Sequence, residues 1–149
     1  MRLPIQVLVY PARNIGSGWE YLMLRRVPKL GGHWQGVTGG IEEGEELTDA
    51  AIRELAEETG LVPSTLEQIN YSYSFPLLDK WRYLYTASVD EILEHVFIAV
   101  VDVQQDPIIS WEHDKYQWCS LSQAIELLTY SENIEALKRC DLYVKSRLT

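Results

Sequence analysis

Four stretches of this chain have the apolar pattern and the residue types of β-strands. The first two, residues 3–10 and 19–27, are separated by the turn-forming sequence Asn-Ile-Gly-Ser-Gly. Two such stretches joined by a short turn are typical of a β-hairpin. Residues 69–85 are rich in aromatic residues and are interrupted at Pro76, whereas residues 96–103 are the most apolar stretch, as expected for a buried strand.

Helical spacing of apolar residues occurs early in the chain and again at its end. Residues 47–59 predict an amphipathic helix that ends at Gly60, a residue type favoured just past a helix C-terminus. We expect Ser120 or Ser122 to cap a helix that runs to residue 129, and residues 132–147 to form a terminal helix. The apolar arc expected to be buried on the early helix comprises Leu47, Ala51, Ile52, Leu55, Ala56 and Thr59.

The order of these elements predicts the fold class. Strands surround one early helix and two helices close the chain, which indicates an α/β or α+β protein. Residues 28–36 are expected to form a loop, and no repeat or linker interrupts the sequence. With 149 residues, of which 46% are hydrophobic and 23% charged, we expect a single domain over residues 1–149.

The charge narrows the classes of function. The net charge is −9, and residues 41–60 account for seven of these charges, with eight acidic side chains against one arginine. An acidic chain is a poor partner for nucleic-acid polymers, which are bound by Lys and Arg. Because no apolar run reaches the roughly 20 residues of a membrane span and no signal peptide is visible, we expect a cytoplasmic protein without membrane contact, as a monomer or homodimer.

Three acidic residues share one face of the early helix. Glu54, Glu57 and Glu58 stand at positions i, i+3 and i+4, and like charges at such offsets cost roughly 0.2–0.5 kcal/mol per pair. A solvated helix face would more favourably alternate the two signs, so a bound divalent cation explains the cluster better. Oxygen ligands alone favour Mg²⁺, or Mn²⁺ in its place.

The residues around this cluster are suited to support such a site. Arg53 can hold a carboxylate through two hydrogen bonds, and Glu45 in the preceding loop is its expected partner. Gly39, Gly40 and Gly44 allow a tight loop whose backbone carbonyl groups can approach an ion.

These residues together resemble the signature of a known family. Gly39, five residues, Glu45, seven residues and then Arg-Glu-Leu-Ala-Glu-Glu-Thr-Gly-Leu at 53–61 match the Nudix box, GX5EX7REUXEEXGU, at all nine defined positions. The resemblance implies a Nudix α/β/α sandwich with a mixed central β-sheet. It also implies hydrolysis of a nucleoside diphosphate linked to another group.

The resemblance assigns roles to the residues of the box. Metal ligands are expected at Glu54, Glu57, Glu58 and the carbonyl of Gly39, and Arg53 belongs to the catalytic set. Glu45 and Gly60 are expected to be structural, and Leu55 and Leu61 to lie in the core. The metal lowers the charge on the pyrophosphate and activates a water, while one glutamate takes its proton; which glutamate does so is left open.

A second motif bears on the substrate. The sequence Glu-His-x-x-Tyr-x-Trp at 112–118 resembles dihydroneopterin triphosphate (dATP) pyrophosphohydrolases and diadenosine tetraphosphate hydrolases of the Nudix family. The stretch Trp-Gln-Gly-Val-Thr-Gly at 34–39 favours the first branch. By this likeness Glu112 is a further metal ligand or the base, although Tyr116 and Trp118 also suit plain packing. We therefore expect a nucleoside or pterin triphosphate to be cleaved to the monophosphate and pyrophosphate.

Other positions leave alternatives. Arg26 is expected either to bind a substrate phosphate or to form a surface ion pair, and Trp34 either to stack on a base or to anchor its loop. Tyr116 is the third candidate for substrate binding. Three other functions remain: a diadenosine polyphosphate hydrolase, an ADP-ribose or nucleotide-sugar pyrophosphatase, and a non-catalytic nucleotide-binding module. The second is suggested by Pro76, because ADP-ribose pyrophosphatases of the family carry a proline at this distance after the box.

Overall fold

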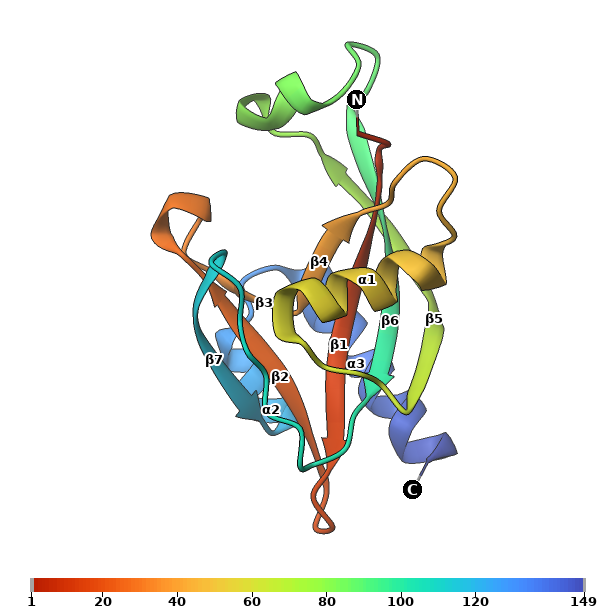
Figure 1. Cartoon of the computed structure of the whole chain (residues 1–149), viewed down its shortest axis with the longest axis vertical. Helices are drawn as coiled ribbons and strands as arrows, with labels where there is room; N and C mark the ends of the chain where they lie inside the picture. The colour runs from red at the N-terminus through yellow and green to blue at the C-terminus, as the bar shows by residue number, and fades with distance from the viewer. Residues whose placement is uncertain (1, 149) are drawn as a thin grey trace.

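A seven-stranded mixed sheet runs through the molecule, and helices cover both of its faces (Figure 1). The computed structural model describes residues 2–148. The strand order is β3-β2-β1-β6-β5, with β4 also paired to β1 and β7 to β2. Strands β1 and β6 run parallel, and all other pairs are antiparallel. The strands are β1 (Ile5–Asn14), β2 (Trp19–Arg26), β3 (Trp34–Gln35), β4 (Val37–Gly40), β5 (Thr65–Pro76), β6 (Glu91–Val100) and β7 (His113–Cys119).

Within residues 2–148, three α-helices form the outer layers. Helix α1 (Leu47–Thr59) lies on one face, in front of the sheet in Figure 1, while α2 (Leu121–Leu127) and α3 (Ser131–Arg147) lie behind it. Two short 3-10 helices, η1 (Pro28–Leu30) and η2 (Asp79–Leu84), lie in connections between strands. The predicted sandwich of helices around a mixed sheet is confirmed.

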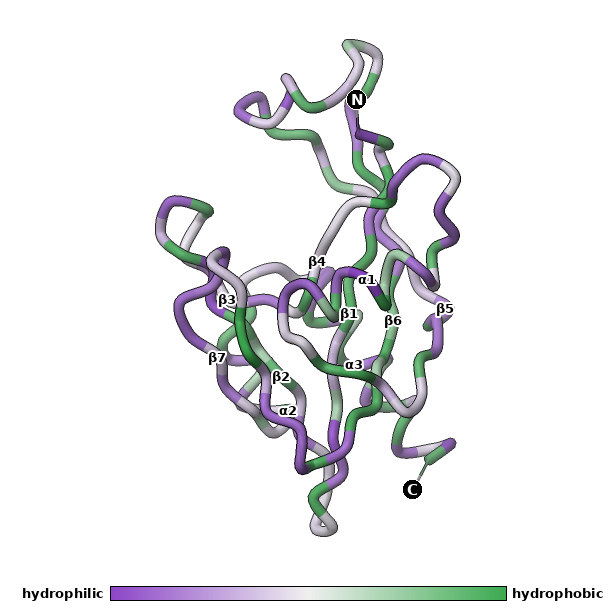
Figure 2. The backbone as a smooth tube through the Cα atoms, viewed as in Figure 1, coloured by the Kyte–Doolittle hydropathy of each residue, from purple (hydrophilic) through white to green (hydrophobic). Residues whose placement is uncertain are grey.

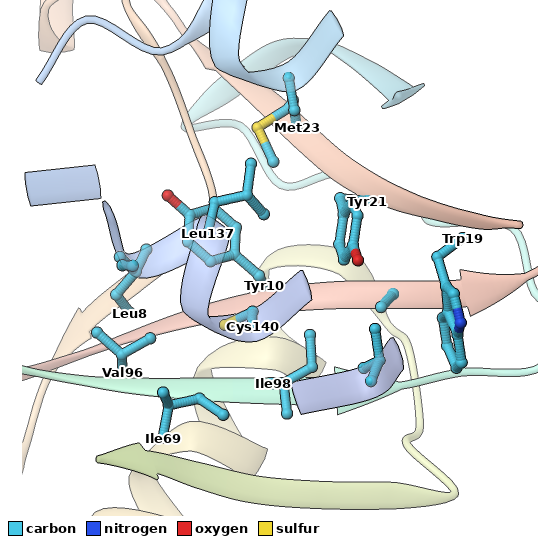
Figure 3. Packing of buried hydrophobic residues seen from close by; sticks show 14 of the residues in the cluster. Leu8, Tyr10, Trp19, Tyr21, Met23, Ile69, Val96, Ile98, Leu137 and Cys140 are labelled. Carbon is cyan, nitrogen blue, oxygen red and sulfur yellow. The ribbon is translucent and has the colours of Figure 1, made fainter. Parts of the chain in front are cut away.

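Alternation along the strands creates two separate cores. Successive side chains of a strand point to opposite faces of the sheet. Thus Val7 of β1 packs beneath α1 with Leu55, whereas the next residue, Leu8, packs with Leu137 of α3. Figure 3 shows the cluster on the α3 side, where Leu8 and Tyr10 meet Leu137 and side chains of β6. The green, hydrophobic segments of β1, β2 and β6 in Figure 2 therefore mark strands that are covered on both faces.

The elements differ from the sequence predictions mainly where a proline ends a strand or where pairing with a distant strand determines its bounds. The predicted loop at 28–36 contains η1 and the two-residue strand β3, which forms because β2 is available as a partner. The strand predicted over 69–85 ends at Pro76, and its aromatic continuation forms η2 instead. Strand β6 covers Glu91–Val100, and thus begins five residues earlier than predicted.

Helix α1 lies on the sheet with a different arc from the one predicted. Ile52, expected in the core, is 45% exposed, and Ala56 is exposed as well. Ala50 and Glu58 are buried in their place, so the buried arc is rotated toward the acidic side of the helix. Leu55 and Leu61 are buried, as predicted.

None of the helices within residues 2–148 combines the length and the apolar character needed to cross a bilayer.

Candidate active site around helix α1

Arg53 ties helix α1 to the loop and the strand that precede it. Its Nε and Nη2 donate to the two carboxylate oxygens of Glu45 at 2.8 and 2.9 Å, and Nη2 also donates to the carbonyl oxygen of Gly40 at 2.9 Å. The hydrogen bonds from Arg53 lower the pKa of Glu45 to about 2. The loop is thereby held against α1 by a charge-assisted pair, which is a strong form of hydrogen bond.

Glu54 lies directly against Gly39 of β4. A Cβ atom on Gly39 would stand 2.0 Å from the carboxyl carbon of Glu54 and 2.3 Å from each of its oxygens, so a side chain fits there only if this carboxylate moves away. Arg53 Nη1 donates to Glu54 Oε1 at 2.7 Å. Only glycine at position 39 therefore lets the carboxylate of Glu54 reach the backbone of β4.

Glu58 is the most buried acid of the site. It is 3% exposed, it shares a side-chain hydrogen bond with Glu54, and its Oε1 has no hydrogen-bond partner. Burial, followed by the proximity of Glu54 and Glu112, raises the pKa of Glu58 to about 10, and burial also raises the pKa of Glu54. Without a bound cation, the pair therefore retains a proton at neutral pH.

Glu112 is held on the same side of the molecule as this pair because its loop is hydrogen-bonded to the end of α1. The backbone N–H of Ile108 donates to the carbonyl of Thr59 at 2.9 Å, and that of Ser110 to the carbonyl of Glu58 at 3.1 Å. On the other side, the carbonyl of Glu112 accepts from Val27 at 2.9 Å. Glu112 itself is half-buried, and its charge contributes to the raised pKa of Glu58.

His113 is a member of the site that sequence reasoning missed. Its side chain is fully buried, its Nε2 lies 3.7 Å from Glu58 Oε1, and neither ring nitrogen has a hydrogen-bond partner. Burial is the main reason that its pKa falls to about 4, so the ring is neutral at pH 7 and forms no ion pair with Glu58. Its position directly after Glu112 was the available signal.

Glu57 does not join the other two acids of the helix. Its side chain is 59% exposed and points toward Arg53, with 3.5 Å between Glu57 Oε2 and Arg53 Nη1. Across residues 2–148, no three Asp, Glu, His or Cys side chains are gathered closely enough to form a complete metal site. The structure therefore brings together Glu54 and Glu58 with Gly39, and leaves Glu57 at the rim.

The three candidates for substrate binding are spread over the two faces. Arg26 follows Leu24 on the α1 face, donates through Nε to the carbonyl of Leu30 at 3.0 Å, and lowers the pKa of Glu58 by its charge. Tyr116 stands opposite Leu24 in β7 and is 39% exposed. Trp34 instead packs against the core on the α3 side, and the Arg25 guanidinium lies 5.9 Å from its ring centroid.

The donor set fits a hard divalent cation. The residues of the Nudix box offer oxygen atoms, one of them the unpartnered buried Oε1 of Glu58, while the neutral His113 ring beside them leaves its nitrogens unpartnered. The missing side chain at Gly39 keeps a carboxylate and a backbone strand in contact. Such oxygen donors are those that Mg²⁺ and Mn²⁺ prefer. Burial is the largest cause of the raised pKa of both Glu54 and Glu58, and a bound cation would oppose it by favouring the ionised carboxylates.

Comparisons with known proteins agree with this geometry. The NUDIX domain family matches residues 3–140. A Haemophilus influenzae dihydroneopterin triphosphate diphosphatase is 36% identical over 110 residues, which are 71% of this chain and 69% of that protein. A Myxococcus xanthus protein named octanoyltransferase is 38% identical over 135 residues, 89% of this chain, but the chain spans only 35% of that protein.

A solved structure shows the same fold. The Escherichia coli dihydroneopterin triphosphate pyrophosphohydrolase superposes with a TM-score of 0.76 at 27% identity, and the match covers 95% of this chain and 97% of that one. The resemblance to this branch of pyrophosphohydrolases is thereby confirmed. The chain belongs to the NUDIX domain family.

Proposed function

We propose that this chain is a metal-dependent pyrophosphohydrolase that cleaves a nucleoside or pterin triphosphate into the monophosphate and pyrophosphate. The observation that carries the proposal is the Glu54–Glu58 pair against Gly39, in which the buried Oε1 of Glu58 has no hydrogen-bond partner that a cation would have to displace. The names of the H. influenzae and E. coli relatives support a triphosphate as the substrate.

Glu54, Glu57, Glu58 and the Gly39 carbonyl would hold the ion, which we propose to be Mg²⁺, with Mn²⁺ as a substitute. Glu112 would be either a further ligand or the base. When bound, the ion neutralises charge on the phosphates and lowers the pKa of a water molecule. Glu57 is exposed at the rim of the site, so it has to turn from Arg53 toward the buried pair.

The protein's own residues account for orientation and proton transfer. Arg53 fixes the loop through Glu45 and Gly40, which keeps Glu54 in place. Arg26 lies on the same face and offers a guanidinium for a phosphate oxygen, because its geometry matches that group. Glu112 comes from a separate loop, so it can accept a proton from the attacking water while the helix acids are engaged.

A nucleotide panel tests the proposal. Dihydroneopterin triphosphate, dATP and GTP are incubated with the protein in Mg²⁺ or in EDTA, and ³¹P NMR identifies the products. We expect monophosphate and pyrophosphate in Mg²⁺ only. Absence of metal-dependent turnover of any triphosphate would contradict the proposal. Turnover restricted to diadenosine tetraphosphate or to ADP-ribose, added to the same panel, would keep a hydrolase but overturn the triphosphate assignment.

The variant Glu57→Gln separates an enzyme from a nucleotide-binding module. In an enzyme, kcat falls by about 10²–10⁴-fold while the fold is kept. A binding module changes mainly its affinity for nucleotide. The matched control is Glu67→Gln, which removes an exposed carboxylate of β5 and leaves the site intact.

A further inference from the structure

A second buried carboxylate lies outside the acidic site. Glu94 of β6 is 3% exposed, and its two oxygens accept hydrogen bonds from the Tyr73 hydroxyl and the Gln6 side-chain amide. Asn133 of α3 donates through Nδ2 to the Tyr73 hydroxyl at 2.7 Å, and Tyr10 donates to the carbonyl of Asn133 at 2.9 Å. No lysine or arginine within residues 2–148 forms an ion pair with Glu94, and burial raises its pKa.

Glu94 lies in the same cross-strand row as Gly40, the last residue of β4. The strand register places Gly40, Gln6, Glu94 and Tyr73 side by side across β4, β1, β6 and β5. All four positions face α3, because Gln6 alternates with Val7, which faces α1. Two strand spacings, about 10 Å, separate Gly40 from Glu94.

The space above Gly40 is open. A Cβ atom on this glycine would meet no atom within 4 Å, in contrast to the neighbouring Gly39. Gln6, the next residue in the row, is only half-buried. A flat group that enters above Gly40 therefore reaches Glu94 as soon as the amide of Gln6 moves aside.

The same strand connects this space to the acidic site. Gly39 faces Glu54, and Gly40 faces the opposite side of the sheet. Among the strands described in residues 2–148, β4 pairs with β1 alone, so its other edge is free of strand pairing. A ligand whose phosphates lie beside Glu54 can thus cross this edge and place its ring in the row with Glu94.

The hydrogen-bonding capacity of Glu94 indicates which ring it would accept. An ionised carboxylate accepts at about four positions, in the plane of its two oxygens, and pairs best with two parallel N–H donors. The Watson–Crick edge of a 2-amino-4-oxo ring presents such donors, the ring N–H and the amino group. Guanine and pterins share this edge, whereas adenine has a ring acceptor there and no 2-amino group.

We propose that Glu94 reads the 2-amino-4-oxo edge of the substrate ring, with the Gln6 amide occupying that place until the ligand enters. The inference rests on the proposed function for the position of the phosphates. It also explains why a carboxylate is kept where an apolar side chain would be less costly to bury. The Tyr73 hydroxyl, held by Asn133, donates to the oxygen of Glu94 that Gln6 does not contact and would keep the carboxylate oriented.

Binding measured in EDTA tests the inference independently of hydrolysis. Isothermal titration compares GMP, IMP, AMP and neopterin, of which IMP differs from GMP only by the missing 2-amino group. We expect GMP and neopterin to bind about 10- to 100-fold more tightly than IMP and AMP, as hydrogen bonds to a charged group imply. If neopterin binds more tightly than GMP, and this binding depends on Glu94, the ring that Glu94 recognises is a pterin. If GMP binds more tightly with the same dependence, the ring is guanine.

In Glu94→Gln the preference for GMP over IMP should disappear, while AMP binding changes little. The control Glu91→Gln removes an exposed carboxylate of the same strand and should keep the preference. Equal loss for all four ligands, or a lower Tm with the preference intact, assigns Glu94 a structural role and overturns the inference.

Two further variants keep the test decisive if Glu94→Gln folds poorly. Gly40→Leu fills the open space and should weaken binding of every ring, whereas Gln6→Ala should retain the preference. Unchanged GMP binding by Gly40→Leu would contradict the location. If the preference is found without metal-dependent turnover, only the proposed function fails; turnover without the preference means that only this inference fails.

Discussion

Replacing Gly39 by alanine should impair the activity of the site much more than the stability of the fold. The new Cβ atom would stand 2.0 Å from the carboxyl carbon of Glu54, which lies at the end of a flexible side chain and has to swing away. Glu54 then loses the 2.7 Å bond from Arg53 Nη1, and such a charge-assisted bond contributes about 1.5–3 kcal/mol. The lower conformational entropy of the unfolded chain with alanine offsets about 0.4–1 kcal/mol of this loss.

The free energy of unfolding should therefore fall by about 1–2 kcal/mol, whereas kcat/KM should fall by about 10²–10⁴-fold. Urea unfolding and hydrolysis at increasing Mg²⁺ concentrations measure the two effects. The control Gly18→Ala adds a Cβ in the β1–β2 turn that meets nothing within 4 Å, and its backbone needs no positive φ. Full activity in Gly39→Ala would refute the role given to the Glu54–Gly39 contact.

Two further predictions concern stability. Arg53 lowers the pKa of Glu45 from 4.5 to about 2, so this pair stabilises the fold above pH 4.5 and its contribution is lost as the pH falls to 2. Urea unfolding at several pH values measures this effect. Between pH 4.5 and pH 2, the free energy of unfolding should fall by about 1–3 kcal/mol less in Glu45→Gln than in the wild type. Equal falls in the two proteins would contradict the pairing. Leu55→Ala should cost about 2–5 kcal/mol because Leu55 is fully buried, whereas Ile52→Ala should cost less than about 1 kcal/mol; equal costs would contradict the orientation of α1.

The sequence predicted those parts of the site that depend on local spacing. Glu45 and Arg53 are eight residues apart, and a loop followed by a helix is enough to bring them together. The same is true of Glu54 and Glu58, which are one helical turn apart. The position of Gly39 against Glu54 was also accessible, because the Nudix box spans both residues.

Features that depend on long-range packing were not accessible in this way. A helical wheel predicted Ile52 in the core, but in the structure Glu58 is buried and Ile52 is exposed. This rotation of α1 depends on how the helix packs on the sheet, and no local sequence pattern predicts it. The loop of Glu112 is held beside Glu58 by backbone hydrogen bonds between residues 49 and 52 positions apart in the chain. The hydrogen bonds of Glu94 join three strands and α3, so they follow only from the register of the folded sheet.

The most direct test of the central claim is a Mn²⁺ titration of the wild type and of Glu54→Gln/Glu58→Gln, followed by electron paramagnetic resonance. The account predicts one saturable site in the wild type, and its loss in the double variant with the fold preserved by circular dichroism. Equal Mn²⁺ binding by both proteins would contradict the claim that these two carboxylates hold the catalytic cation.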